Sequence, residues 1–127
     1  MNFYSLQLGP PAEELEPWRS LVTDLRPDVS SDWTETATAL RQLDLLISID
    51  SAVANLAGAL GRPVWMCLAA MPDNRWALER TDTPWYSSAR LFRQPRMGEW
   101  GTVFAEVATA LRGRLAEARA GGLSQVA

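Results

Sequence analysis

Asp50 and Ser51 are the residues of this chain best placed to do chemistry, because they separate an apolar run from a stretch of small residues. The apolar run 45–49 has the length of a buried strand, and residues 51–60 have the composition of a helix. The pattern therefore predicts a helix N-terminus at the carboxyl end of a strand. Free backbone N–H groups and the helix dipole make such a position suitable for a phosphate or a diphosphate.

Two further residues of the predicted helix fit the same chemistry. Ala52 is small enough to let a ligand approach, and Asn55 lies one turn after Ser51, where its amide can donate to a phosphate oxygen. The same residues also fit a plain helix N-cap with no ligand, in which Asp50 or Ser51 accepts a backbone hydrogen bond. Both interpretations are compatible with the residue types.

The loop 69–80 follows the next predicted strand, 63–69, and should lie at the same sheet edge. Arg75 is a candidate anion contact, and Trp76 either contacts a sugar or nucleotide or packs in the core. Gln7, at the end of the predicted strand 2–8, is a weaker binding candidate. Aromatic residues of loops often stack on ligands, so Trp85 and Tyr86, which follow Pro84, are further candidates for ligand contact.

The absence of two residue types limits the possible catalysis. The chain has no histidine and no lysine, since all twelve of its basic residues are arginine. This excludes Ser-His-Asp and Cys-His catalysis within the chain, and it excludes a P-loop. The single cysteine, Cys67, lies in an apolar run and is interpreted as a small buried residue.

Composition and charge narrow the class of protein further. The net charge of −3 gives no basic surface for nucleic acid, and no apolar run approaches the roughly 20 residues of a membrane span. No secretory leader opens the sequence, so the cytoplasm is the expected compartment. The length of 127 residues fits one domain, expected at 1–120, with a frayed tail at 121–127.

Strand and helix patterns alternate along the chain, which predicts an α/β fold with a parallel sheet between helices. We expect the run 45–49 to be a central strand covered on both faces, because its residues are apolar without alternation. Gly61 suits a residue with positive φ after the helix, and Gly58 suits a close contact with the sheet. The further elements predicted from the pattern are strands at 21–25 and 91–92 and helices at 11–20, 33–43 and 99–119.

Four segments together resemble a known family: FYSLQLGP, DLLISIDSAVANLAGALGRPVWMCL, DNRWALERTDTPWY and RLFRQPRMGEW. They look like the C-terminal domain of bacterial GT-B glycosyltransferases of the family 9 or heptosyltransferase type. More narrowly, they resemble the glycosyltransferase portion that follows tetratricopeptide repeats in some bacterial proteins. The resemblance implies a Rossmann-like three-layer sandwich that binds a nucleotide sugar without a metal or another cofactor.

The resemblance also implies roles for particular residues. The donor diphosphate would lie on Asp50, Ser51, Ala52 and the helix N-terminus. The family usually has histidine at the position of Asn55, and asparagine cannot carry its positive charge, so weaker phosphate binding is expected. A non-catalytic interaction module that kept the fold and lost the ligand is the alternative function.

Compared with the family, the chain lacks the N-terminal domain and the first strand and helix of the C-terminal domain. The missing strand would be central in the usual strand order. Two hypotheses follow, because unpaired backbone groups at a buried edge are unfavourable. Either the strand 2–8 pairs directly with the strand 45–49, or a homodimer closes the sheet. The isolated chain is expected to be inactive as a transferase.

Overall fold

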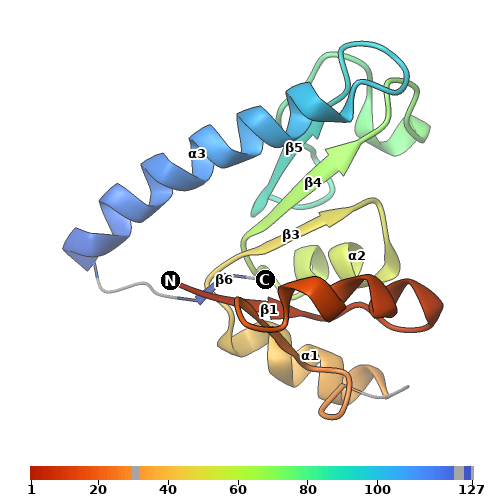
Figure 1. The fold of residues 1–127 in the computed structure, drawn as a ribbon. Coiled ribbons are helices and arrows are strands. Elements are labelled where there is room, and N and C mark those ends of the chain that lie inside the picture. The colour runs from red at the N-terminus through yellow and green to blue at the C-terminus, as the bar shows by residue number, and fades with distance from the viewer. Residues whose placement is uncertain (30–31, 122–124, 127) are drawn as a thin grey trace.

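The computed structural model describes residues 1–29, 32–121 and 125–126 of the chain and shows an α/β fold (Figure 1). Helices and strands alternate as the sequence pattern predicts, and every strand pair is parallel. In order, the elements are β1 (Asn2–Ser5), η1 (Pro10–Trp18), β2 (Val22–Asp24), α1 (Trp33–Gln42), β3 (Leu46–Ile49), α2 (Ala52–Ala59), β4 (Val64–Leu68), η2 (Asn74–Trp76), β5 (Ala89–Arg93), α3 (Trp100–Gly121) and β6 (Gln125–Val126). The predicted helix at 11–20 is a 3₁₀ helix, η1, and the predicted loop 69–80 contains a second 3₁₀ helix, η2.

The described strands form two separate sheets, with the orders β2-β1-β6 and β3-β4-β5. The predicted direct pairing of the strand 2–8 with the strand 45–49 is therefore wrong. On the edge opposite β2, β1 pairs instead with Gln125–Val126 near the C-terminus. Gly121 was predicted to lie in a frayed tail, but it is the last residue of α3. The same prediction for residues 122–124 and 127 lies outside the described residues.

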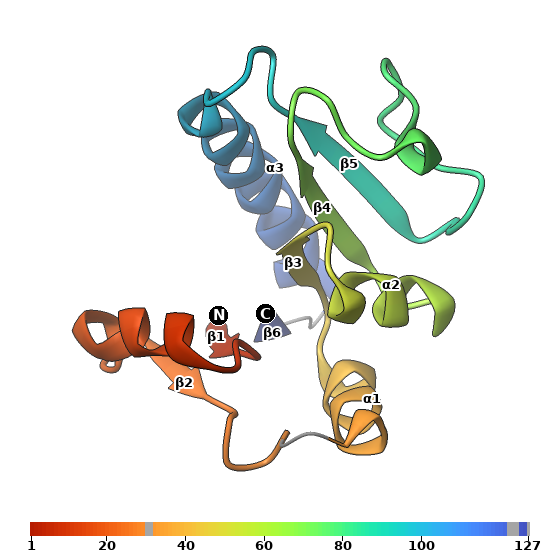
Figure 2. The ribbon, with the colours of Figure 1, turned by 90° about the vertical axis from the view of Figure 1, so that its right-hand side faces the viewer.

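The strand β4 is the one that is central and covered on both faces. All five of its residues are buried. Val64, Met66 and Leu68 belong to a core cluster shared with α1 and α2, whereas Trp65 and Cys67 belong to a second cluster shared with α3. Alternate residues of a strand point to opposite faces, so β4 anchors a layer of helix on each side of its sheet (Figure 2).

The run 45–49 is not a central strand, contrary to the prediction. β3 lies at the edge of its sheet and pairs only with β4 among the described strands. Its burial falls along the strand, from Leu46 at 5% exposed to Ile49 at 60% exposed. An apolar run without alternation therefore did not distinguish an edge strand from a central one.

The predicted starts of the helices 33–43 and 51–60 are both present. Asp32 caps α1 and accepts a hydrogen bond from the backbone N–H of Thr34 at 2.8 Å. Ser51 caps α2, with an extended backbone and its hydroxyl accepting from the Ala54 N–H at 3.2 Å. Gly61 has a φ of 67°, in the left-handed region that favours glycine, as expected for the residue that ends α2.

Gly58 makes its close contact with an aromatic ring and not with the sheet as predicted. A Cβ atom at this position would lie 2.6 Å from Cδ2 of Tyr86. The Tyr86 ring therefore packs directly on the backbone of α2, and only glycine leaves room for it. This contact ties the loop before β5 to the helix of the candidate site.

We expect the substitution Gly58→Ala to lower the free energy of unfolding by about 1–3 kcal/mol, because overpacking against Tyr86 outweighs the gain in helix propensity. The matched control is Gly101→Ala in α3, where an added Cβ has no neighbour within 4 Å. That control should be neutral or stabilising by up to about 1 kcal/mol. Urea unfolding followed by circular dichroism measures both, and equal stability of the two variants would contradict the packing argument.

Candidate functional site

The junction between β3 and α2 carries the first two candidate residues, Asp50 and Ser51. The Ser51 hydroxyl caps α2 and lies 2.9 Å from the hydroxyl of Ser48 on β3. Within the described residues, no hydrogen bond is formed by the N–H groups of Ala52 and Val53, the first two residues of α2. Ala52 is exposed. The geometry at the start of the helix is therefore that of a capped N-terminus whose first N–H groups stay available.

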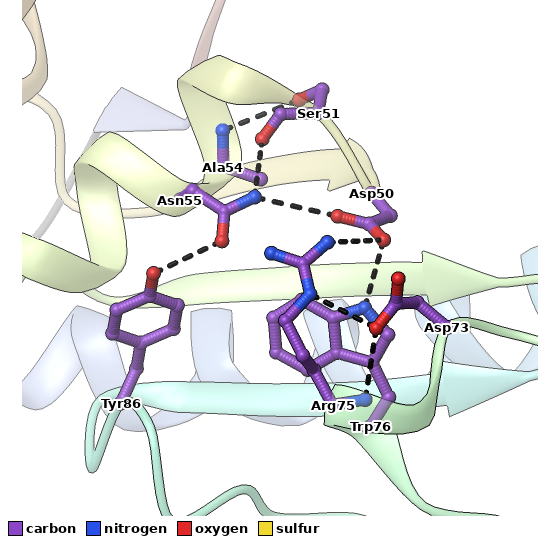
Figure 3. A network of polar contacts seen from close by, with 8 residues as sticks. All are labelled: Asp50, Ser51, Ala54, Asn55, Asp73, Arg75, Trp76 and Tyr86. Atoms are coloured by element: carbon purple, nitrogen blue, oxygen red, sulfur yellow. Dashed lines mark hydrogen bonds and ion pairs between the residues drawn. The ribbon is translucent and has the colours of Figure 1, made fainter.

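Asn55 lies one turn into α2, and both atoms of its amide group have partners (Figure 3). Its Nδ2 donates to the Ser51 carbonyl at 2.9 Å and to Asp50 Oδ1 at 3.3 Å. Its Oδ1 accepts a hydrogen bond of 3.0 Å from the Tyr86 hydroxyl. Asn55 thus connects the start of α2 with the loop before β5.

The second carboxylate oxygen of Asp50 connects the same junction to the loop after β4. It accepts a hydrogen bond of 2.8 Å from the indole Nε1 of Trp76, and it lies 3.6 Å from the guanidinium of Arg75. The Trp76 side chain is only 1% exposed and belongs to the core shared with α1 and α2. Trp76 therefore packs in the core, with its N–H directed at Asp50.

Arg75 is the cationic group of the network, and its side chain is 46% exposed. Its Nε donates to Asp73 Oδ1 at 3.0 Å, and its guanidinium lies 5.4 Å from the centre of the Trp76 ring. Hydrogen bonds from the backbone and side chain of Arg75 lower the pKa of Asp73, and the bond to Asp73 raises the pKa of Arg75. Arg75 stays charged in any physiological medium and faces two carboxylates.

The structure divides the predicted binding residues between two places. Asp50, Ser51, Asn55, Arg75 and Trp76 form one connected network at the end of β3. Gln7 lies outside this network and lines a cavity of about 650 Å³ between β1 and β3, on which Ser51 also borders. Ser51 thus belongs to both the network and the cavity lining, whereas Gln7 belongs only to the cavity lining.

The sequence predicted Tyr86 only as a loop aromatic residue that could stack on a ligand. It did not predict the contacts of Tyr86 with α2. Its hydroxyl orients Asn55, and its ring occupies the space above Gly58. The one sequence signal for this role was a glycine inside a helix, a position where a bulky neighbour is expected.

The chemistry available at the network is recognition rather than nucleophilic attack. Its titratable groups are two carboxylates, Asp50 and Asp73, together with Tyr86 and Arg75. Cys67 is buried in β4, and burial raises the pKa of its thiol, which disfavours the reactive thiolate. Among the described residues, no cluster of three or more Cys, Asp or Glu side chains has the geometry to hold a metal ion.

Comparison with known proteins gives one relative. No protein-family model matches the chain, and no solved structure is significantly similar to it. The chain is similar to the protein FlbA of Caulobacter vibrioides, with 34% identity over 119 residues that cover 87% of the chain and 19% of FlbA. It therefore spans about a fifth of the length of this relative. The part of the chain that the structure describes has no helix with the length and apolar character needed to cross a membrane.

We expect Trp76→Phe to lower the free energy of unfolding by about 1.5–3 kcal/mol, because Asp50 then loses a donor to its charged oxygen. The control is Trp85→Phe, since the Trp85 side chain is 63% exposed and should change stability by less than about 0.5 kcal/mol. Thermal and urea unfolding of both variants test this expectation. A Trp76 variant as stable as the wild type would show that the indole N–H contributes nothing to the fold.

Proposed function

We propose that this chain is the donor-binding portion of a glycosyltransferase of GT-B type, taking the diphosphate of a nucleotide sugar where β3 ends and α2 begins. One observation carries the proposal. Ser51, Asn55 and Arg75, from two separate segments, converge at the N-terminus of a helix. The cytoplasm remains the expected compartment for such a portion.

In this proposal each group has a definite task. The N–H groups of Ala52 and Val53, together with the helix dipole, face one phosphate. The Arg75 guanidinium binds the other, which it can do with two parallel hydrogen bonds. Asp50 and Asp73 already neutralise Arg75, so a diphosphate has to compete with them, and affinity in the millimolar range is expected.

The chain binds without catalysing transfer in this proposal. It contains no histidine or lysine, the residues that most often act as a base or cation in group transfer. The resemblance assigns the acceptor site and the catalytic base to another domain. The chain covers only 19% of FlbA, so an activity of that longer protein does not have to reside in the part that this chain resembles.

Titration of the ¹⁵N-labelled protein with UDP, GDP and ADP tests the proposal. We expect amide shifts at Ser51, Ala52 and Val53, and a loss of affinity of about tenfold in Arg75→Ala, the effect of one charged hydrogen bond. Arg80→Ala is the matched control, because Arg80 lies in the same loop with a similar exposure and pairs with Asp82. The highest nucleotide concentration is 10 mM, on the order of the weakest dissociation constants of specific binding. The absence of any amide shift near Ser51 at that concentration rejects the proposal.

Replacing Asn55 by histidine should restore a cation at the site. We expect Asn55→His to bind UDP more tightly than the wild type below the ordinary histidine pKa of about 6.5, and to lose that gain as the pH rises through it. Titrations at pH 5.5 and pH 8.0, on the order of one unit or more to either side of that pKa, measure the difference. An affinity unaffected by pH would mean that no phosphate approaches position 55.

A second candidate function is an interaction module that has lost its ligand. The observation in its favour is that the polar atoms of Asn55 and Asp50 are already bonded within the network. In that case the network stabilises the fold and has no ligand. The same titration separates the two functions, since an interaction module shows no nucleotide response while keeping its stability.

A further inference from the structure

A cavity of about 650 Å³ lies between the two sheets, with β1 on one side and β3 on the other (Figure 2). One wall consists of residues 4–8, at and beyond the end of β1, and the opposite wall consists of residues 46–49 of β3. Leu15, Val22, Ser51 and Val53 complete the lining. We call this cavity the inter-sheet slot. The two strands beside it, β1 and β3, run in the same direction (Figure 1).

On the β3 side of the slot, the outer edge of β3 has no partner among the described strands. The N–H of Leu46 donates to the Pro63 carbonyl, toward β4. Successive residues of a strand direct their backbone groups to opposite sides, so those of Ile47 and Ile49 face away from β4 and into the slot. In the described part of the chain, neither residue forms a backbone hydrogen bond on that side.

The β1 side of the slot has the same character. The carbonyl of Ser5 accepts a hydrogen bond from Leu25, on the β2 side. The C=O and N–H of one trans peptide point in opposite directions, so the N–H of Leu6 points away from β2 and toward the slot, which Leu6 lines. Two strand edges therefore face each other across an apolar cavity, and unpaired backbone groups at such edges favour pairing with another strand.

One segment of the chain already sits at the entrance of the slot and shows what fits there. Gln125–Val126 pairs in parallel with Asn2 and Phe3, on the edge of β1 opposite β2. The parallel bridge between Phe3 and Val126 uses the N–H of Tyr4, and the edge is open beyond it, from the Tyr4 carbonyl to Leu6. An extended backbone parallel to β1 is thus the conformation that this edge accepts.

We propose that the inter-sheet slot takes one extended segment of a partner polypeptide, which runs parallel to β1 and β3 and joins the two sheets into one. The lining defines its chemistry. Leu6, Leu46, Ile47 and Val53 require apolar side chains along most of the segment, whereas Gln7, Ser48 and Ser51 favour a polar residue at its carboxyl end. Main-chain hydrogen bonds give affinity and the lining gives specificity, as in other cases of strand addition.

A partner polypeptide fits the slot better than a second copy of this chain. Both edges belong to the same molecule, so a strand between them has to be a segment without a sheet of its own, whereas another copy would present a sheet edge flanked by its own helices. The related segment of FlbA also makes up only 19% of a much longer polypeptide, so in that protein ample further chain accompanies it. The inference does not depend on nucleotide binding, because the strand would bind in the inter-sheet slot and the nucleotide at the first N–H groups of α2 and at Arg75.

The test uses the full chain and the blocked peptide acetyl-Val-Thr-Val-Thr-Val-amide as a probe. We expect amide shifts and slower hydrogen exchange at Leu6, Ile47 and Ile49, with Arg75 unchanged. Ile47→Pro should weaken binding at least tenfold, because it removes an N–H that faces the slot and not the one that pairs with β4. Ile47→Val, which keeps that N–H, is the matched control and should bind as the wild type does.

A second variant guards against misfolding of the proline variant. Ile49→Lys places a charge at the mouth of the slot, where the side chain is already 60% exposed, and should also weaken binding at least tenfold. Amide spectra of β4 report whether each variant is folded. Peptide contacts elsewhere, unchanged binding in both variants, or no protection at the three slot amides would each overturn the proposal. So would a dimer by light scattering whose slot amides are protected without peptide. A missing response to nucleotide leaves these readouts unaffected.

Discussion

The carboxylate of Asp50 is the interaction on which the candidate site depends. It receives hydrogen bonds from the core indole of Trp76 and from Asn55, and it faces the guanidinium of Arg75. Two segments that are separate in sequence are thereby fixed at one point: the junction between β3 and α2, and the loop after β4. A carboxylate bound by several donors is held in position. The same carboxylate is what a phosphate would have to displace from Arg75, so the strength of the network limits the affinity of the ligand.

Much of the sheet β3-β4-β5 and of the helices α1 and α2 could be predicted from sequence, because local sequence signals and packing agree there. The continuous apolar run of β4, the cap residues Asp32 and Ser51, and the positive φ of Gly61 all follow from residue type at one position. The strand order could not be predicted in this way. An edge strand and a central strand can have the same apolar run, and only the identity of the neighbouring strand separates β3 from β4.

The candidate site was predictable to the extent that its residues follow the ends of parallel strands. Asp50, Ser51 and Arg75 meet for this reason, and the sequence placed them at one edge. The sequence did not show that Asn55 is held by Tyr86, since this contact joins residues 31 positions apart through a loop without regular structure. Nor did it show that Gln7 lies apart from the other candidates, because Gln7 follows β1, and β1 lies in the other sheet.

The position of Ser51 links the two halves of the molecule. Its hydroxyl caps α2 and lies 2.9 Å from that of Ser48, and both residues line the inter-sheet slot. A strand in the slot would end against these hydroxyls, directly behind the first turn of α2. Pairing of Ile47 and Ile49 would at the same time order the exposed end of β3, which carries Asp50. Ordering a segment before its ligand arrives lowers the entropy that binding must overcome. The gap between the sheets and the proposed anion site are therefore connected, because the edge of β3 that lacks a neighbour among the described strands is the edge that positions the site.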